Sequence, residues 1–243
     1  MTERILLSDL LKDENRLSRF ILEMRSGAVA AVPTDTLYGL AVDSDSAAGV
    51  SAVYDLKGRD ASKPLILFLY DSADLGKLEI FPSPSQKRVL EQFWPGQLTV
   101  VFPLPAAKPE NFGWNPGSHN GHRARGERGE KAFGLFGNHA FGFSTLGIRV
   151  PDHPELRRLL SVYPGHLLTT SANPSGAEPI CDPDEIARAF SPGLHWLLDG
   201  GILPKSSAST VLDVSSSPPR ILREGRISRI ELASTGIFEA QRA

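Results

Sequence analysis

Apolar runs and amphipathic stretches alternate along most of the chain. Residues 13–27 repeat apolar side chains at helical spacing, whereas residues 65–70 form an unbroken apolar run that is too short for a helix. Strands that alternate with helices in this way are typical of an α/β domain built on one sheet. The pattern predicts strands at 28–32, 40–42, 65–70, 98–104, 145–150, 194–198, 210–214 and 221–222, and helices at 13–27, 46–58, 83–94, after 152, at 182–190 and at 227–232.

Capping residues mark several of these boundaries. Ser46 is placed to cap the helix that Gly58 ends, and Asp182 with Glu185 predicts a capping box at the start of a later helix. Lys57 then falls in the last turn of its helix. Residues 33–38 connect two strands, and connections carry binding groups more often than the interiors of elements do.

One stretch shows neither the helical nor the strand repeat of apolar residues. Residues 106–143 contain eight glycines, three histidines and a charged centre, which predicts a flexible insertion loop. His119, His122 and His139 could ligate a metal there, but a solvated role is simpler, and we expect no metal held by protein side chains alone. Because no repeat or linker divides the rest, a single domain over residues 1–243 is expected.

Composition limits the function classes. A formal charge of −2 argues against indiscriminate nucleic-acid binding, so any anion site must be local. Cys181 is the only cysteine, which excludes an intramolecular disulfide framework and a cysteine-built zinc site. The N-terminus lacks a leader pattern, and no apolar run approaches membrane-spanning length. We therefore expect a soluble, cytoplasmic protein with no membrane partner.

Cations and hydroxyls gather at the predicted strand ends. Lys57, Arg59 and Lys63 fall within seven residues, and such a cluster suits a phosphate or carboxylate ligand, although the charge spacing alone favours a solvated helix end. Phosphate-loop, dinucleotide-binding, zinc-protease and serine-hydrolase motifs are all missing from the sequence. The remaining groups can position and stabilise an anion without supplying a general base, as phosphoryl and nucleotidyl transfer require.

Seven sequence blocks together carry a family pattern. In chain order they read PTDTLYGLAVD, YDLKGRDASKPLIL, FWPGQLTVVFP, TLGIRVPDHP, TSANPSGAEP, STVLDV and ILREG. In this order they resemble the YrdC-like threonylcarbamoyl-AMP synthase family. The resemblance implies a single-domain YrdC-like twisted mixed sheet, flanked by helices, around a deep basic cavity. It also implies a nucleotidyltransferase that converts L-threonine, bicarbonate and ATP to threonylcarbamoyl-adenylate and pyrophosphate, for N6-threonylcarbamoyladenosine at position 37 of tRNA.

The same resemblance assigns roles to individual residues. Lys57 and Arg59 would be catalytic, neutralising charge as a carbamate oxygen attacks the α-phosphorus, and Mg²⁺ would enter with ATP, bound mainly through its phosphates. Arg149 would pair with the threonine carboxylate. The threonine site implied is Thr36, Arg149, Thr169 and Ser209, and the ATP site implied is Arg59, Lys63, Thr145, Ser171, Asn173 and Arg223.

The chain also departs from the family pattern. Phe68 stands where many members carry histidine, and Ala208 stands where many carry glutamate, so contacts near threonine are expected to differ. Longer members cover the site with an interdomain linker, and we hypothesise that loop 106–143 does so here. RNA or tRNA and proteins that transfer the threonylcarbamoyl group are the implied partners. The alternatives are a paralogue that binds RNA or assists ribosome maturation without synthase activity, and a nucleotide-binding regulatory module.

Overall fold

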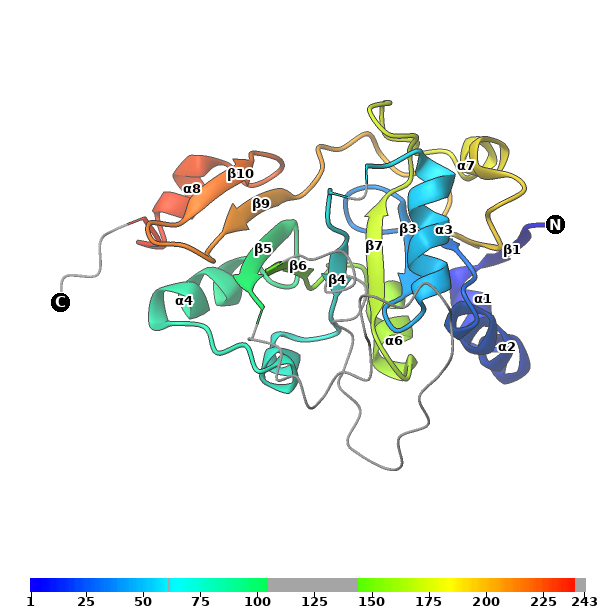
Figure 1. Ribbon diagram of the computed structural model, residues 1–243, viewed down its shortest axis with the longest axis horizontal. Coiled ribbons are helices and arrows are strands. Elements are labelled where there is room, and N and C mark those ends of the chain that lie inside the picture. The colour runs from blue at the N-terminus through cyan, green and yellow to red at the C-terminus, as the bar shows by residue number, and fades with distance from the viewer. Residues whose placement is uncertain (61, 105–143, 239–243) are drawn as a thin grey trace, which may run out of the picture.

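A ten-stranded mixed sheet runs through the molecule in the computed structural model, which describes residues 1–60, 62–104 and 144–238 (Figure 1). The strand order is β1-β8-β2-β3-β7-β4-β6-β5-β9-β10. The expected loop 106–143 lies outside the described residues, so the hypothesis that it covers the site stays a prediction. The strands are β1 (Glu3–Leu6), β2 (Ala30–Val32), β3 (Gly39–Asp43), β4 (Ile66–Phe68), β5 (Leu98–Pro103), β6 (Thr145–Arg149), β7 (Leu167–Ser171), β8 (Trp196–Asp199), β9 (Thr210–Asp213) and β10 (Arg220–Arg223).

Helices cover both faces of this sheet. Apolar side chains of α1, α2 and α6 pack in one core cluster, whereas those of α3, α4 and α7 pack in the other. In Figure 1, α3 lies along β3, with α1 and α2 towards the β1 edge and α4 towards the β10 edge. The helices are α1 (Leu7–Leu10), α2 (Glu14–Arg25), α3 (Ala47–Lys57), α4 (Pro84–Phe93), α6 (Pro154–Val162), α7 (Pro183–Phe190) and α8 (Arg229–Ala233), with a 3₁₀ helix, η1, at Ser72–Leu78.

Strand alternation explains how one sheet serves two cores. Ala30 and Val32 of β2 point to the α2 side, while Ala31 between them points to the α3 side. Leu40 and Val42 of β3 also face α3. The central strands are therefore apolar on both faces, which is why they read as short continuous runs in the sequence.

The predicted helix caps are largely confirmed. Ser46 Oγ accepts a hydrogen bond from the amide of Gly49, and Gly58 ends α3 in the left-handed conformation at φ 56°. The capping box expected at the start of α7 is wrong. The Asp182 carboxylate accepts from the amide of Asp184 at 2.8 Å, one residue earlier than the Glu185 amide that a capping box requires.

Two N-terminal elements and η1 were not predicted. β1 has only one buried residue, Ile5, and charged neighbours, so its sequence carries no strand alternation. It forms because it pairs in parallel with β8, where Ile5 lies opposite Leu198. This strand is thus specified by a partner almost the whole chain away.

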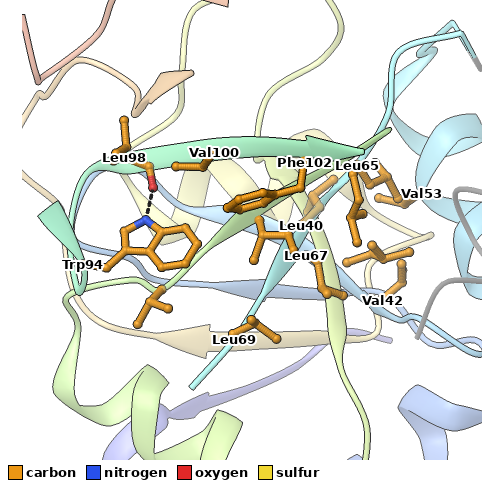
Figure 2. Packing of buried hydrophobic residues seen from close by; sticks show 14 of the residues in the cluster. Leu40, Val42, Val53, Leu65, Leu67, Leu69, Trp94, Leu98, Val100 and Phe102 are labelled. Carbon is orange, nitrogen blue, oxygen red and sulfur yellow. Dashed lines mark hydrogen bonds between the residues drawn. The ribbon is translucent and has the colours of Figure 1, made fainter. Parts of the chain in front are cut away.

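The larger core cluster packs around Trp94, the residue that follows α4. Figure 2 shows its indole beside Leu98 and Val100, with Phe102, Leu40 and Leu67 continuing the apolar layer towards α3. The buried indole Nε1 donates a hydrogen bond to the carbonyl oxygen of Leu98 at 2.7 Å. This bond joins the end of α4 to the start of β5.

We expect Trp94→Phe to lower the free energy of unfolding by about 1–3 kcal/mol, because the Leu98 carbonyl would lose its buried indole donor. Chemical denaturation followed by circular dichroism measures this change. Phe81→Leu is the control, since Phe81 is 81% exposed and its replacement should change the free energy little. A Trp94→Phe variant as stable as Phe81→Leu would contradict the stabilising role of this bond.

Candidate functional site

A cavity opens over the middle of the sheet, above β3, β7, β4 and β6. It encloses about 610 Å³ of empty space, part of which is open to solvent. Its floor follows the register of the strands, because Gly39 lies opposite Ser171, and Ile66 lies opposite Thr169. The lining residues are Thr34, Thr36, Leu37, Tyr38, Gly39, Arg59, Pro64, Ile66, Phe68, Arg149, Thr169, Thr170, Ser171, Ala208, Ser209 and Arg223.

Arg149, the last residue of β6, is the most deeply buried cation of the cavity, at 4% exposure. Its Nε donates to the carbonyl oxygen of Gly96 at 2.8 Å, and its Nη1 donates to Thr36 Oγ1 at 3.0 Å. Its Nη2 forms a 2.7 Å ion pair with Asp35 Oδ1. These three bonds fix the guanidinium plane and leave one N–H on each terminal nitrogen for a ligand.

Two further arginines reach the cavity from opposite sides. Arg59 follows the C-terminus of α3, and its Nε and Nη2 donate to the carbonyl oxygens of Lys63 and Pro64 at 3.2 and 3.1 Å. Arg223 ends β10, and its Nε and Nη2 donate to the carbonyl oxygen of Ser209 at 3.2 and 2.8 Å. Backbone oxygens therefore orient both side chains, and the nearby Asp60 offsets only part of the charge of Arg59.

The three guanidinium groups raise the positive potential of the cavity. Burial lowers the pKa of Arg223, and the nearby charge of Arg59 lowers it further. Burial likewise lowers the pKa of Arg149, against the opposing effect of Asp35, and Arg223 adds a smaller repulsion. None of the described residues that line the cavity is acidic. A bound anion would relieve this repulsion.

Hydroxyl groups on the cavity wall are held in place before any ligand arrives. Thr34 Oγ1 accepts hydrogen bonds from the amides of Thr36 and Leu37 at 3.0 and 3.1 Å, and lies 3.0 Å from Thr36 Oγ1. Ser209 Oγ lies 2.9 Å from Thr99 Oγ1 on β5. The connection between β2 and β3 is therefore a rigid turn that presents its hydroxyls to the cavity.

Tyr38 fixes the same turn to a distant loop. Its hydroxyl donates to the carbonyl oxygen of Gly201 at 2.8 Å and accepts from the amide of Gly200 at 2.9 Å. Burial raises the pKa of Tyr38 to about 12, so the phenol stays protonated at neutral pH. These bonds help hold the chain between β8 and β9, which supplies Ala208 and Ser209 to the cavity.

Residues 23–121 and 128–225 match the model of the Sua5/YciO/YrdC family, which carries the description "telomere recombination". The chain belongs to the Sua5/YciO/YrdC family. The Sua5/YciO/YrdC pattern spans most of the described sheet, from within α2 to the end of β10. The resemblance drawn from the seven sequence blocks is thereby confirmed.

Several curated relatives carry the name threonylcarbamoyl-AMP synthase. A threonylcarbamoyl-AMP synthase from Bacillus subtilis is 27% identical over 227 residues, which cover 92% of this chain and 57% of the relative. A threonylcarbamoyl-AMP synthase from Mus musculus is 34% identical over 202 residues, which cover 80% of this chain and 61% of the relative. The chain thus spans less than two thirds of the length of either protein.

A solved structure of the family matches the fold. The crystal structure of P. abyssi Sua5 complexed with L-threonine superposes with a TM-score of 0.73 at 25% identity, covering 92% of this chain and 58% of that one. The expected fold class, a mixed sheet flanked by helices around a basic cavity, is therefore confirmed. That structure shows that a member of the family binds L-threonine.

Most of the residues assigned through the family resemblance meet at the cavity. They come from six separated parts of the chain, including the β2–β3 turn and the ends of β6, β7 and β10. Their roles towards substrate stay predictions, because the geometry places the side chains without a ligand. The assigned residues that line the cavity are Thr36, Arg59, Arg149, Thr169, Ser171, Ser209 and Arg223.

Four assigned residues do not line it. Lys57 is buried at 4% exposure beneath the cavity wall, and Asn173 is buried in the turn after β7. The side-chain Nδ2 of Asn173 donates to the carbonyl oxygens of Pro174 and Ala177, at 3.0 and 2.6 Å. Lys63 is exposed and Thr145 is half-buried at the start of β6.

The family resemblance assigned no role to several lining residues. Thr34 and Thr170 adjoin assigned residues, so the run of hydroxyls around each was the signal available. Asp35 was missed as the partner of Arg149, because 114 positions separate the two in sequence. Asp35 Oδ2 is also buried without a hydrogen-bond partner among the described residues. Phe68 and Ala208, the two departures from the family pattern, both line the cavity and make part of its wall apolar.

No cluster of three or more histidine, cysteine, aspartate or glutamate residues that could hold a metal occurs in the described ranges. Nor is any helix in these ranges long and apolar enough to cross a membrane.

Proposed function

We propose that this chain is an L-threonylcarbamoyladenylate synthase, which uses L-threonine, bicarbonate and ATP and releases pyrophosphate, in the formation of N6-threonylcarbamoyladenosine in tRNA. The observation that carries the proposal is the convergence of Arg59, Arg149 and Arg223 on a cavity rich in hydroxyls and free of acidic lining residues among those described. The names of the curated relatives and the threonine complex of a structural neighbour support the same substrates.

Threonine is proposed to bind at the buried end of the cavity. The two N–H groups that Arg149 keeps free suit a carboxylate, and Thr36 Oγ1 lies beside the same guanidinium. Thr169 and Ser209 add hydroxyls to the wall. Because Asp35 and Gly96 already hold Arg149 in one orientation, binding a carboxylate needs little reordering of this side chain.

The triphosphate is proposed to lie between Arg59 and Arg223. In the reaction the threonine amine first forms a bond to the carbon of bicarbonate, which loses water and leaves a carbamate. A carbamate oxygen then attacks the α-phosphorus, forming a new oxygen–phosphorus bond as the bond to the leaving pyrophosphate breaks. Negative charge grows on the phosphate oxygens during this step, and fixed guanidinium groups stabilise it without reorganising.

Magnesium is proposed to enter with ATP. The cavity offers hydroxyls but no acidic lining residue among those described, a donor set that suits an ion carrying most of its ligands from phosphate and water. When bound, Mg²⁺ would neutralise charge on the β- and γ-phosphates. The protein residues then have to position the α-phosphorus and the carbamate.

The remaining partners belong to the same proposal. Bicarbonate is the source of the carbamate carbon, and proteins that transfer the threonylcarbamoyl group to tRNA would consume the adenylate. RNA contact is proposed near Arg223, where Arg226 and Arg229 follow in the chain and are exposed. A cytoplasmic location stays a prediction from the sequence.

Pyrophosphate release tests the proposal. We expect release from ATP only when threonine and bicarbonate are both present, and a loss of release when either is omitted. Serine and valine in place of threonine measure how the apolar wall at Phe68 affects specificity. ATP binding without threonine-dependent release would contradict the proposal and favour a regulatory module, and RNA binding without nucleotide binding would contradict it in favour of a non-synthetic paralogue.

A further inference from the structure

Lys57 does not line the cavity that Arg59, two residues later, enters. It is the last residue of α3, and its side chain is 4% exposed although it carries a formal charge. Its burial lowers its pKa to about 8, with a smaller effect from the charge of Arg59. A lysine this buried requires partners for its N–H donors.

Those partners all come from the last residue of β7 and the turn that follows it. Lys57 Nζ donates to the carbonyl oxygen of Ser171 and, at 2.6 Å, to that of Asn173. A longer contact of 3.5 Å reaches the side-chain oxygen of Asn173. An ammonium group has no further N–H to offer once these acceptors are engaged. Phosphate oxygens could reach Nζ only by breaking one of these bonds.

The backbone of the same residue binds the turn as well. The amide of Ser175 donates to the carbonyl oxygen of Lys57 at 3.0 Å. Ala172, between the two carbonyl acceptors, donates its amide to the carbonyl oxygen of Tyr38 at 2.8 Å. The C-terminus of α3 thus holds residues 171–175 against the β2–β3 turn, and Ser171 at their start lines the cavity.

We infer that Lys57 is a positioning residue, which fixes the 171–175 turn and acts on the nucleotide through Ser171 and not by direct contact with phosphate. The inference rests on the proposed function of the cavity and assigns a different role to the residue expected to be catalytic. Arg59, which lines the cavity two residues later, supplies the charge that meets the substrate.

Hydrogen exchange tests whether Lys57 fixes the 171–175 turn, a contact that we call the Lys57 clamp. The measurement needs no catalytic turnover. We expect Lys57→Met to speed amide exchange in residues 172–177 by about ten- to a hundredfold, the range for losing charge-assisted hydrogen bonds, while amides of β3 and β6 change little. Lys77→Met is the matched control, because the Lys77 side chain is 65% exposed and, among the described residues, its ion pair is with the nearby Asp74. Equal exchange in the two variants would overturn the inference.

A kinetic cycle tests the route through Ser171. If Lys57 acts through this residue, Lys57→Met and Ser171→Ala should lower kcat/KM for ATP non-additively, so the double variant is little worse than Lys57→Met alone. When Lys57→Met is combined with Arg59→Gln, the losses in kcat/KM for ATP should instead be close to additive. Additive losses with Ser171→Ala would overturn the inference. If Lys57→Met does not fold, Lys57→Gln keeps part of the donor set and should give smaller changes of the same kind.

Hydrogen exchange and pyrophosphate release together distinguish a failure of this inference from a failure of the proposed function. Faster exchange in residues 172–177 without threonine-dependent pyrophosphate release would support the clamp and contradict the synthase. Unchanged exchange with normal dependence on threonine would contradict the clamp and leave the synthase supported.

Discussion

Arg59→Ala is expected to lower threonine-dependent pyrophosphate release by about a hundred- to a thousandfold, the range found when one preorganised donor to a developing anion is removed. Arg59 lines the cavity, and its side chain is oriented by the carbonyl oxygens of Lys63 and Pro64. Its charge also lies close enough to Arg223 to lower the pKa of that side chain. The variant therefore loses a fixed charge where negative charge grows, and kcat should fall more than the threonine KM rises.

Folding should be little affected, because the carbonyl groups of Lys63 and Pro64 belong to exposed residues that water can reach. Circular dichroism and thermal unfolding check that Arg59→Ala is folded. Arg16→Ala is the matched control, since Arg16 is an exposed arginine of α2 paired only locally with Asp13. A folded Arg59→Ala enzyme with parental pyrophosphate release would contradict the role assigned to this arginine.

Arg149→Met is expected to lower the free energy of unfolding by about 3–5 kcal/mol and to abolish measurable threonine binding. The side chains of Arg149 and Asp35 are 5% and 10% exposed, and their atoms Nη2 and Oδ1 are 2.7 Å apart. Removing one partner of such a pair leaves an uncompensated buried charge. The second oxygen, Asp35 Oδ2, has no hydrogen-bond partner among the described residues, which increases the penalty.

The double variant Asp35→Asn/Arg149→Met separates stability from binding. Its free energy of unfolding should recover most of the loss, because the buried carboxylate is gone, whereas threonine binding should stay absent. Urea denaturation and isothermal titration calorimetry with threonine measure the two quantities. If the double variant bound threonine normally, Arg149 would not be the carboxylate ligand, and if Arg149→Met were as stable as the parent, the ion pair would not be structural.

Capping residues and apolar runs predicted the helices and strands that are specified by residues close together in the sequence. The boundaries of α3 follow from Ser46 and Gly58, and the short apolar runs of β2, β3 and β4 could be recognised because both faces of the central sheet are buried. The hydroxyls of the β2–β3 turn and of β7 were also found, since each follows an apolar run directly. These features are determined by residues that are close together in the sequence, so they can be predicted from it.

Long-range pairing could not be predicted in the same way. β1 exists because it pairs with β8, and the orientation of Arg149 depends on Asp35, which is 114 positions away. Lys57 and Arg59 are two residues apart, so charge spacing groups them, yet they point to different partners because Gly58 reverses the chain between them. The family resemblance assigned seven residues that do line the cavity, but a motif does not state which side of the cavity wall a side chain occupies.

The most direct test of the central claim is to identify the product. The protein is incubated with ATP, L-threonine, Mg²⁺ and ¹³C-labelled bicarbonate, and the nucleotides are resolved by mass spectrometry. We expect threonylcarbamoyl-AMP that carries the label in its carbamoyl carbon, together with pyrophosphate, and no such product from the Arg59→Ala variant. Nucleotides that contain only ATP and its hydrolysis products, with no labelled adenylate, would contradict the central claim.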